Sequence, residues 1–150
     1  MVIDPLPRSF EPPEDLAHSL DVRFGDEFRL LGYDLTREGS SLNLTLHWQA
    51  TQRPQESYKV FAHLFEPASE ALAAQVDAIP RGWTYPTNWW EAGETVSDVM
   101  LLSLEDVPLG RYRIAVGMYA PDSGARVPVF DGAGELQPQG RLTLPEEIDW

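Results

Sequence analysis

Aromatic residues with hydrogen-bonding neighbours lie close together between Pro80 and Gly93. Indole and phenol rings combine a large apolar face with a polar group. Binding sites for small ligands are mostly apolar surfaces that carry a few polar groups, and a sugar ring could stack on such a surface. Residues 83–94 are therefore the candidate ligand-binding loop, in which Asn88, Glu91 and the nearby Asp98 could bond to ligand hydroxyls. Its candidate contacts are Trp83, Tyr85, Asn88, Trp89, Trp90 and Glu91.

The same rings have a structural alternative. Each tryptophan side chain buries a large area when it packs inside a protein, and large aromatic residues are highly buried on average. The cluster could therefore close the open end of a folded domain rather than face a ligand. The structural role is favoured, because large aromatic residues pack in cores far more often than they form ligand platforms. A mixed outcome, with some rings buried and others exposed, is the third alternative.

Metal sites have weaker support. His47 and His63 lie on consecutive predicted strands and could face each other, but a metal would need a further ligand and no His-x-x-x-His spacing is present. Acidic turns could hold calcium, yet no regular calcium-binding loop occurs. We therefore predict no metal site and no cofactor. The acidic residues considered were Asp21, Asp26, Glu27, Asp34, Asp122 and Asp131.

Catalytic signatures are missing from the sequence. The chain has no cysteine, no Gly-x-Ser-x-Gly motif and no phosphate-binding or dinucleotide-binding motif. It has 24 acidic residues, and any two of them could form the carboxylate pair of a glycoside hydrolase. Nothing in the sequence singles out such a pair. We predict that the chain is not an enzyme and keep a hydrolase as the least favoured alternative.

Charge and hydropathy exclude several kinds of partner. The net charge of −13 over 150 residues would repel nucleic acid and anionic membrane surfaces. No apolar run approaches the length of a membrane span, and the N-terminus lacks the features of a secretory signal. A complete chain would therefore stay in the cytoplasm, whereas a domain excised from a membrane protein would be extracytoplasmic. A protein or a glycan remains a possible partner.

Period-two hydrophobicity predicts the elements that position these residues. Residues 41–50 alternate between apolar and polar side chains, which is typical of a strand with one buried face. Residues 95–104 and 111–119 form two further strands, and the spacing of Leu104, Pro108 and Tyr112 is typical of a tyrosine corner. Further strands are expected at 20–24, 28–35 with a bulge at Gly32, 58–65, 71–76, 125–130 and 141–144.

Short strands that recur about every ten residues predict an all-β fold. We expect an antiparallel two-sheet sandwich of the immunoglobulin or fibronectin type III kind, with seven to nine strands. Prolines and acidic residues at 1–18 predict an arm or linker. The sandwich is expected to span residues 19–145, and residues 146–150 form an acidic tail.

Several short motifs also occur in a familiar order, over roughly residues 19–130. They are FRLLGYD (28–34), LTLHW (44–48), KVFAHL (59–64), YPT (85–87), WEAGE (90–94), GRY (110–112), VGMY (116–119) and PDSG (121–124). Together they resemble an uncharacterised β-sandwich domain at the C-terminal end of bacterial membrane glycosyltransferase-like proteins. The resemblance implies a non-catalytic accessory role at the outer side of the cytoplasmic membrane, and it assigns no site residues.

These observations favour a non-catalytic accessory or interaction domain of the bacterial envelope. The first alternative is a carbohydrate-binding module that uses residues 83–94. The second is the hydrolase.

Overall fold

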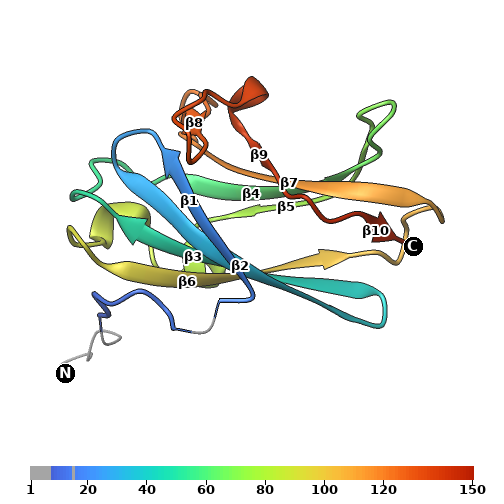
Figure 1. The fold of residues 1–150 in the computed structure, drawn as a ribbon, viewed down its shortest axis with the longest axis horizontal. Helices are drawn as coiled ribbons and strands as arrows, with labels where there is room; N and C mark the ends of the chain where they lie inside the picture. Colours follow the sequence, from blue (N-terminus) through green and yellow to red (C-terminus); the bar gives the residue numbers. More distant parts are fainter. Residues whose placement is uncertain (1–7, 15) are drawn as a thin grey trace.

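The computed structural model describes residues 8–14 and 16–150, and its strands stack in two antiparallel sheets (Figure 1). The predicted two-sheet sandwich is therefore confirmed. Positions 1–7 and 15 of the predicted arm lie outside the described residues. The first sheet has the order β6 (Thr95–Ser103), β3 (Ser41–Ala50), β2 (Phe28–Glu38), β1 (His18–Phe24) and β8 (Val129–Phe130). The second has the order β10 (Ile148–Asp149), β7 (Arg111–Tyr119), β4 (Lys59–Phe65) and β5 (Leu72–Ala78), and β9 (Leu142–Thr143) also pairs with β7.

Ten strands are described, against seven to nine expected, because β8, β9 and β10 are two-residue segments. The remaining elements are short helical turns. They are α1 (Pro80–Trp83), η1 (Thr87–Trp89) and η2 (Pro138–Gly140). None of the helices in the described part of the chain is long and apolar enough to cross a membrane.

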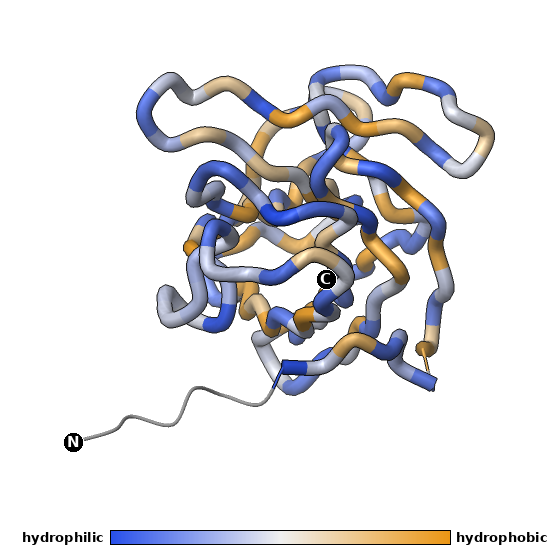
Figure 2. Tube along the Cα trace, turned by 90° about the vertical axis from the view of Figure 1, so that its left-hand side faces the viewer, coloured by the Kyte–Doolittle hydropathy of each residue, from blue (hydrophilic) through white to orange (hydrophobic). Residues whose placement is uncertain are grey.

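The core lies between the two sheets. Along β3, Leu42, Leu44, Leu46 and Trp48 point inward and are almost completely buried, as the period-two pattern predicts. Figure 2 shows the same alternation of hydrophobic and hydrophilic residues along other parts of the trace. Each fully buried side chain of this size contributes about 2 kcal/mol through the hydrophobic effect, so this row is a main source of the stability of the sheet.

The tyrosine corner is confirmed. Tyr112, near the start of β7, donates its hydroxyl hydrogen to the carbonyl oxygen of Pro108 at 2.6 Å. This bond fixes the connection between β6 and β7, which are edge and inner strands of different sheets. The pairing of β3 with β2 and β6 in one sheet, and of β4 with β7 in the other, is the arrangement of an immunoglobulin-like sandwich.

Gly32 forms the predicted bulge and allows the arm to approach. The register between β2 and β3 shifts between Leu30 and Gly32, and a Cβ atom at Gly32 would lie 2.4 Å from the carbonyl oxygen of His18. The described part of the arm then follows the outside of the first sheet (Figure 1). It is tied at one end by a hydrogen bond from the Thr95 amide to the Ser9 carbonyl, at 2.7 Å.

Two C-terminal segments differ from the expected course. Residues 125–130 were expected to form one strand that pairs back on 111–119. Only the first part does so, through the bridge between Tyr119 and Arg126, and Val129 and Phe130 then join β1 in the other sheet. Pro128 lies where the chain passes from one sheet to the other. Proline has no N–H group, so it cannot donate a hydrogen bond to a neighbouring strand at this point. Residues 148–149 of the segment predicted as an acidic tail pair with β7 as β10.

Candidate functional site: the loop from residue 80 to residue 94

The loop is anchored to the body of the protein by buried side chains. Thr87 is completely buried, and its hydroxyl donates to the carbonyl oxygen of Glu56 at 2.6 Å and accepts from the amide of Tyr58 at 2.9 Å. Trp90 is also completely buried and packs edge-on against Phe28, with ring centroids 5.6 Å apart. These two residues hold the 3₁₀ turn η1 against the sandwich.

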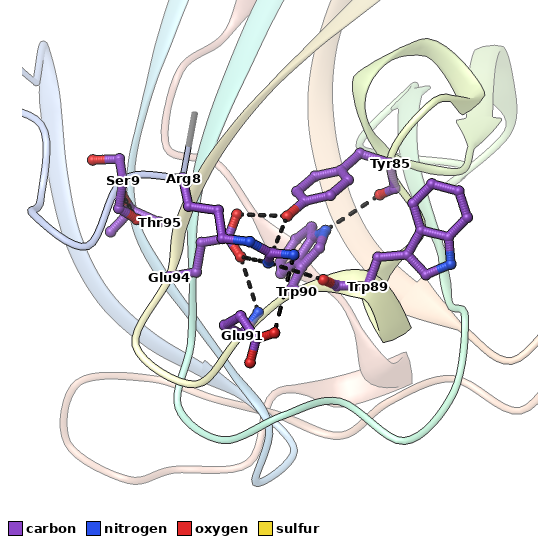
Figure 3. Close-up of polar contacts among 8 residues, drawn as sticks. All are labelled: Arg8, Ser9, Tyr85, Trp89, Trp90, Glu91, Glu94 and Thr95. Atoms are coloured by element: carbon purple, nitrogen blue, oxygen red, sulfur yellow. Dashed lines mark hydrogen bonds and ion pairs between the residues drawn. The ribbon is translucent and has the colours of Figure 1, made fainter. Parts of the chain in front are cut away.

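A buried carboxylate organises the second half of the loop (Figure 3). Glu94 is 1% exposed and accepts three hydrogen bonds. They come from the Arg8 guanidinium at 2.7 Å, the Tyr85 hydroxyl at 2.7 Å and the Glu91 amide at 2.9 Å. Burial and the bond to Glu94 raise the pKa of Tyr85 to about 12, so the phenol stays protonated and donates. Glu94 thus joins the arm, the aromatic ring and the loop backbone.

The first half of the loop has unusual backbone geometry. Arg81, Gly82 and Trp83 all have φ between 56° and 73°, in the left-handed region that non-glycine residues rarely adopt. The amide of Arg81 donates to a carboxylate oxygen of Asp98, at 2.8 Å, on the neighbouring strand β6. Consecutive left-handed residues are costly, and they persist only when surrounding contacts hold them. Asp98 supplies one such contact.

Asp98 does not face solvent. It points into the sandwich from β6, is 3% exposed, and is covered by α1. Burial raises its pKa to about 6, and the hydrogen bond and charge of Arg81 partly oppose that rise. The sequence suggested that Asp98 could bind ligand hydroxyls beside the aromatic rings, but its side chain instead supports the loop from below.

Two tryptophans and one amide of the loop remain accessible. Trp83 is 55% exposed and Trp89 is 57% exposed, and Asn88 is also exposed. The ammonium group of Lys59 lies 4.7 Å from the centroid of the Trp83 ring, a cation–π contact that leaves only the rest of that ring for other contacts. Large exposed aromatic side chains on a firmly anchored loop are informative, because such residues are usually buried.

The six candidate residues therefore divide into two groups. Trp90 is inaccessible, the Tyr85 hydroxyl is committed to Glu94, and Glu91 contributes its backbone amide to the same carboxylate. These three build the loop. Trp83, Asn88 and Trp89 are the accessible candidates, and we call these three residues together the tryptophan surface. The mixed outcome, with some rings buried and others exposed, is the one that the structure shows.

Sequence reasoning missed the residues that hold this surface in place. Arg8 was assigned to the arm, and it bonds to the Tyr85 hydroxyl, the Trp89 carbonyl and Glu94. Nothing in the sequence links it to partners that lie 77–86 positions away. Glu94 carried a weak signal, since it immediately follows the Trp-rich segment and begins a strand pattern. Lys59, the single lysine of the chain, carried none.

The two strand histidines do not meet. His47 lies on the outer face of the first sheet and His63 on that of the second, so the core separates them. No group of three or more metal-ligating side chains is found in residues 8–14 and 16–150. The idea that His47 and His63 share a metal is therefore wrong.

His47 instead belongs to a polar chain across three strands. Its Nδ1 lies 2.8 Å from the Ser97 hydroxyl and its Nε2 lies 2.8 Å from Asp34. The tautomer with hydrogen on Nε2 satisfies both contacts. The other Asp34 oxygen accepts from the Ala17 amide at 2.9 Å. The residue types are those of a serine hydrolase, but the two ring nitrogens have exchanged roles relative to that template. The chain of bonds fastens the arm.

Two glutamates line one pocket beside the β1–β2 turn. Glu27 and Glu56 both line a pocket of about 350 Å³. Both oxygens of Glu27 are engaged, one by the Tyr58 hydroxyl at 3.2 Å and the other by the Gln55 amide at 2.8 Å. A carboxylate held in this way is poorly placed to act as a nucleophile or to receive a proton.

Comparisons with known proteins add little. A scan of protein-family models found no match, and a search of curated proteins found none either. Two solved structures of OgpA from Akkermansia muciniphila match over 85% and 81% of this chain, with 13% and 12% identity and TM-scores of 0.40 and 0.38. One is the wild type, and the other is a catalytically inactive form in complex with an O-glycopeptide. The match covers only 30% and 31% of those chains.

Proposed function

We propose that this domain is a non-catalytic accessory module that binds a glycan through its tryptophan surface. The observation that carries the proposal is the accessibility of Trp83 and Trp89, each more than half exposed, on a loop that the buried side chains of Thr87, Trp90 and Glu94 anchor. Asn88 lies between them in sequence and can donate and accept hydrogen bonds. Flat aromatic faces with a few polar groups suit sugar rings.

The rigidity of the loop supports binding. Glu94, Thr87 and Trp90 fix the backbone through buried contacts. A surface that is already ordered loses little conformational entropy when a ligand arrives. An accessory role also agrees with the engaged state of Glu27 at the carboxylate pocket. Placement in a bacterial envelope rests on the resemblance described above and remains part of the proposal.

A glycan array tests the proposal directly. The native protein, Trp83→Ala, Trp89→Ala and Leu109→Ala are compared on the same array. Leu109 is 82% exposed and lies on the connection between β6 and β7, so it controls for loss of an exposed apolar residue. We expect each tryptophan variant to lose about tenfold in affinity for the glycans that the native protein binds, as central aromatic contacts do. Binding that is equal in all four proteins, or its absence from the native protein, would refute the glycan proposal. Capture of a protein ligand that both tryptophan variants lose would instead assign the surface to a protein partner.

A further inference from the structure

A second polar pocket lies on the outer face of the second sheet. Its volume is about 270 Å³. It lies between β5 on one side and the turn after β7 on the other. Pockets for drug-sized ligands usually measure roughly 300–1,000 Å³, so this one suits a single sugar-sized group. The residues that line it and carry the argument are Phe61, His63, Gln75, Asp77, Tyr119 and Arg126.

Gly117 is the reason that a hollow exists here. Phe61 lies directly opposite Gly117 in the register of β4 and β7. A Cβ atom at position 117 would lie 2.3 Å from Cζ of Phe61, so the ring rests on the glycine backbone. Phe61 is consequently 2% exposed although it points to the outer face. The buried Phe61 ring forms the floor of the pocket, and the side chains of the other lining residues form its walls.

The walls carry both donors and acceptors. The guanidinium of Arg126 lies 4.6 Å from the Phe61 ring centroid and donates one hydrogen bond to the Gln139 carbonyl, at 2.8 Å. An arginine has five N–H donors in a fork that matches a carboxylate. On the other side, the Tyr119 hydroxyl donates to Asp77, which fixes that carboxylate as an acceptor. His63 and the Gln75 amide can each donate and accept.

Two arginines, Arg126 and Arg141, lie near His63, although the protein as a whole is strongly acidic. Burial lowers the pKa of His63, and the charges of Arg126 and Arg141 lower it further, against the weaker opposing effect of Asp77. Arg141 stacks over Phe65 at 4.5 Å and pairs with Glu70 at 2.9 Å. An anionic group bound beside His63 can pair with Arg126, whose guanidinium lies over the Phe61 ring in the same pocket.

We propose that the pocket between Arg126, His63 and Asp77 binds a sugar unit that bears a carboxylate, of the hexuronic acid class. The carboxylate pairs with Arg126 and His63, and the ring hydroxyls bond to Asp77 and Gln75. None of Trp83, Asn88 and Trp89 lines this pocket, so the proposal stands whether or not the tryptophan surface binds a glycan.

The test is an NMR titration of the three histidines with glucuronate, with glucose as the neutral control. Sugar is added to about 10 mM, which exceeds a dissociation constant of about 1 mM tenfold. We expect glucuronate to raise the pKa of His63 by roughly 0.5 or more, while glucose has no such effect. His18 and His47 serve as internal controls, because neither lines this pocket.

Variants assign the effect to the pocket. Arg126→Gln is expected to abolish the response of His63, and Arg53→Gln, at an exposed arginine of another loop, is expected to keep it. Gln75→Ala, at an exposed position on the edge strand β5, should weaken binding several-fold without affecting the fold. A His63 pKa that does not change with glucuronate, or that changes equally with glucose or in Arg126→Gln, would overturn the proposal.

Discussion

Asp98 is a carboxylate that the protein buries under α1, and it makes stability depend on pH. Burial raises its pKa from 3.8 to about 6. Between these values the folded protein keeps a proton that the unfolded chain releases, so the free energy of unfolding falls as pH rises from about 4 to 6. A pKa rise of this size corresponds to about 3 kcal/mol of lost stability at neutral pH.

Asp98→Asn should therefore stabilise the protein at pH 7. The asparagine keeps an oxygen that can accept from the Arg81 amide, and it carries no charge to bury. We expect a gain of about 1–3 kcal/mol at pH 7 and little difference at pH 4. Urea unfolding at both pH values measures this. A variant that is less stable than the native protein at pH 7 would contradict the argument.

Tyr112 is the second residue whose single contact can be tested. Tyr112→Phe removes the bond to the Pro108 carbonyl, which is 2.6 Å long, and leaves that acceptor without its partner. We expect a loss of about 1–2 kcal/mol in urea unfolding. Tyr58→Phe, which removes a longer bond of 3.2 Å to Glu27, is the control and should lose less. Equal losses of unfolding free energy in the two variants would mean that the Tyr112 bond stabilises the protein no more than the Tyr58 bond does.

At the scale of elements, Glu94 controls the order of the loop. Glu94→Ala leaves the Tyr85 hydroxyl and the Glu91 amide without their acceptor. We expect it to cost about 2–3 kcal/mol and to speed hydrogen exchange of the amides in residues 83–94. Glu91→Ala is the matched control, since the Glu91 carboxylate is half-buried and lies 4.0 Å from Arg8. Unchanged exchange in Glu94→Ala would show that other contacts hold the loop.

Gly117 determines the packing of the outer face of the second sheet. Gly117→Ala would force the Phe61 ring away from β7, because the new Cβ would lie 2.3 Å from it. Overpacking of this kind costs about 1–3 kcal/mol, and thermal unfolding would measure the loss. Gly132→Ala is the control, since its Cβ would meet its nearest atom at 3.5 Å. If both variants unfold at the same temperature, the Phe61 ring does not rest on the backbone of Gly117.

At the scale of the whole molecule, local patterns predicted the sheets well. The alternation in 41–50 and the Leu104–Tyr112 spacing correspond to β3 and the tyrosine corner, because period two and turn chemistry are short-range properties. The site depends on contacts between distant positions. Arg8 bonds to Glu94, which is 86 positions further along the chain. The Phe61 ring on β4 rests on Gly117 of the neighbouring strand β7. No local pattern in the sequence encodes such pairs.

The division of the Trp-rich loop is the central claim, and acrylamide quenching of tryptophan fluorescence tests it most directly. Of the five tryptophans, Trp83 and Trp89 are exposed, Trp48 and Trp90 are completely buried, and Trp150 is half-buried. We predict that native emission is quenched strongly and that Trp90→Phe does not lower the quenched fraction. The double variant Trp83→Phe, Trp89→Phe should lose most of the quenching and keep only the part that comes from Trp150. Quenching in the double variant as strong as in the native protein would contradict the account.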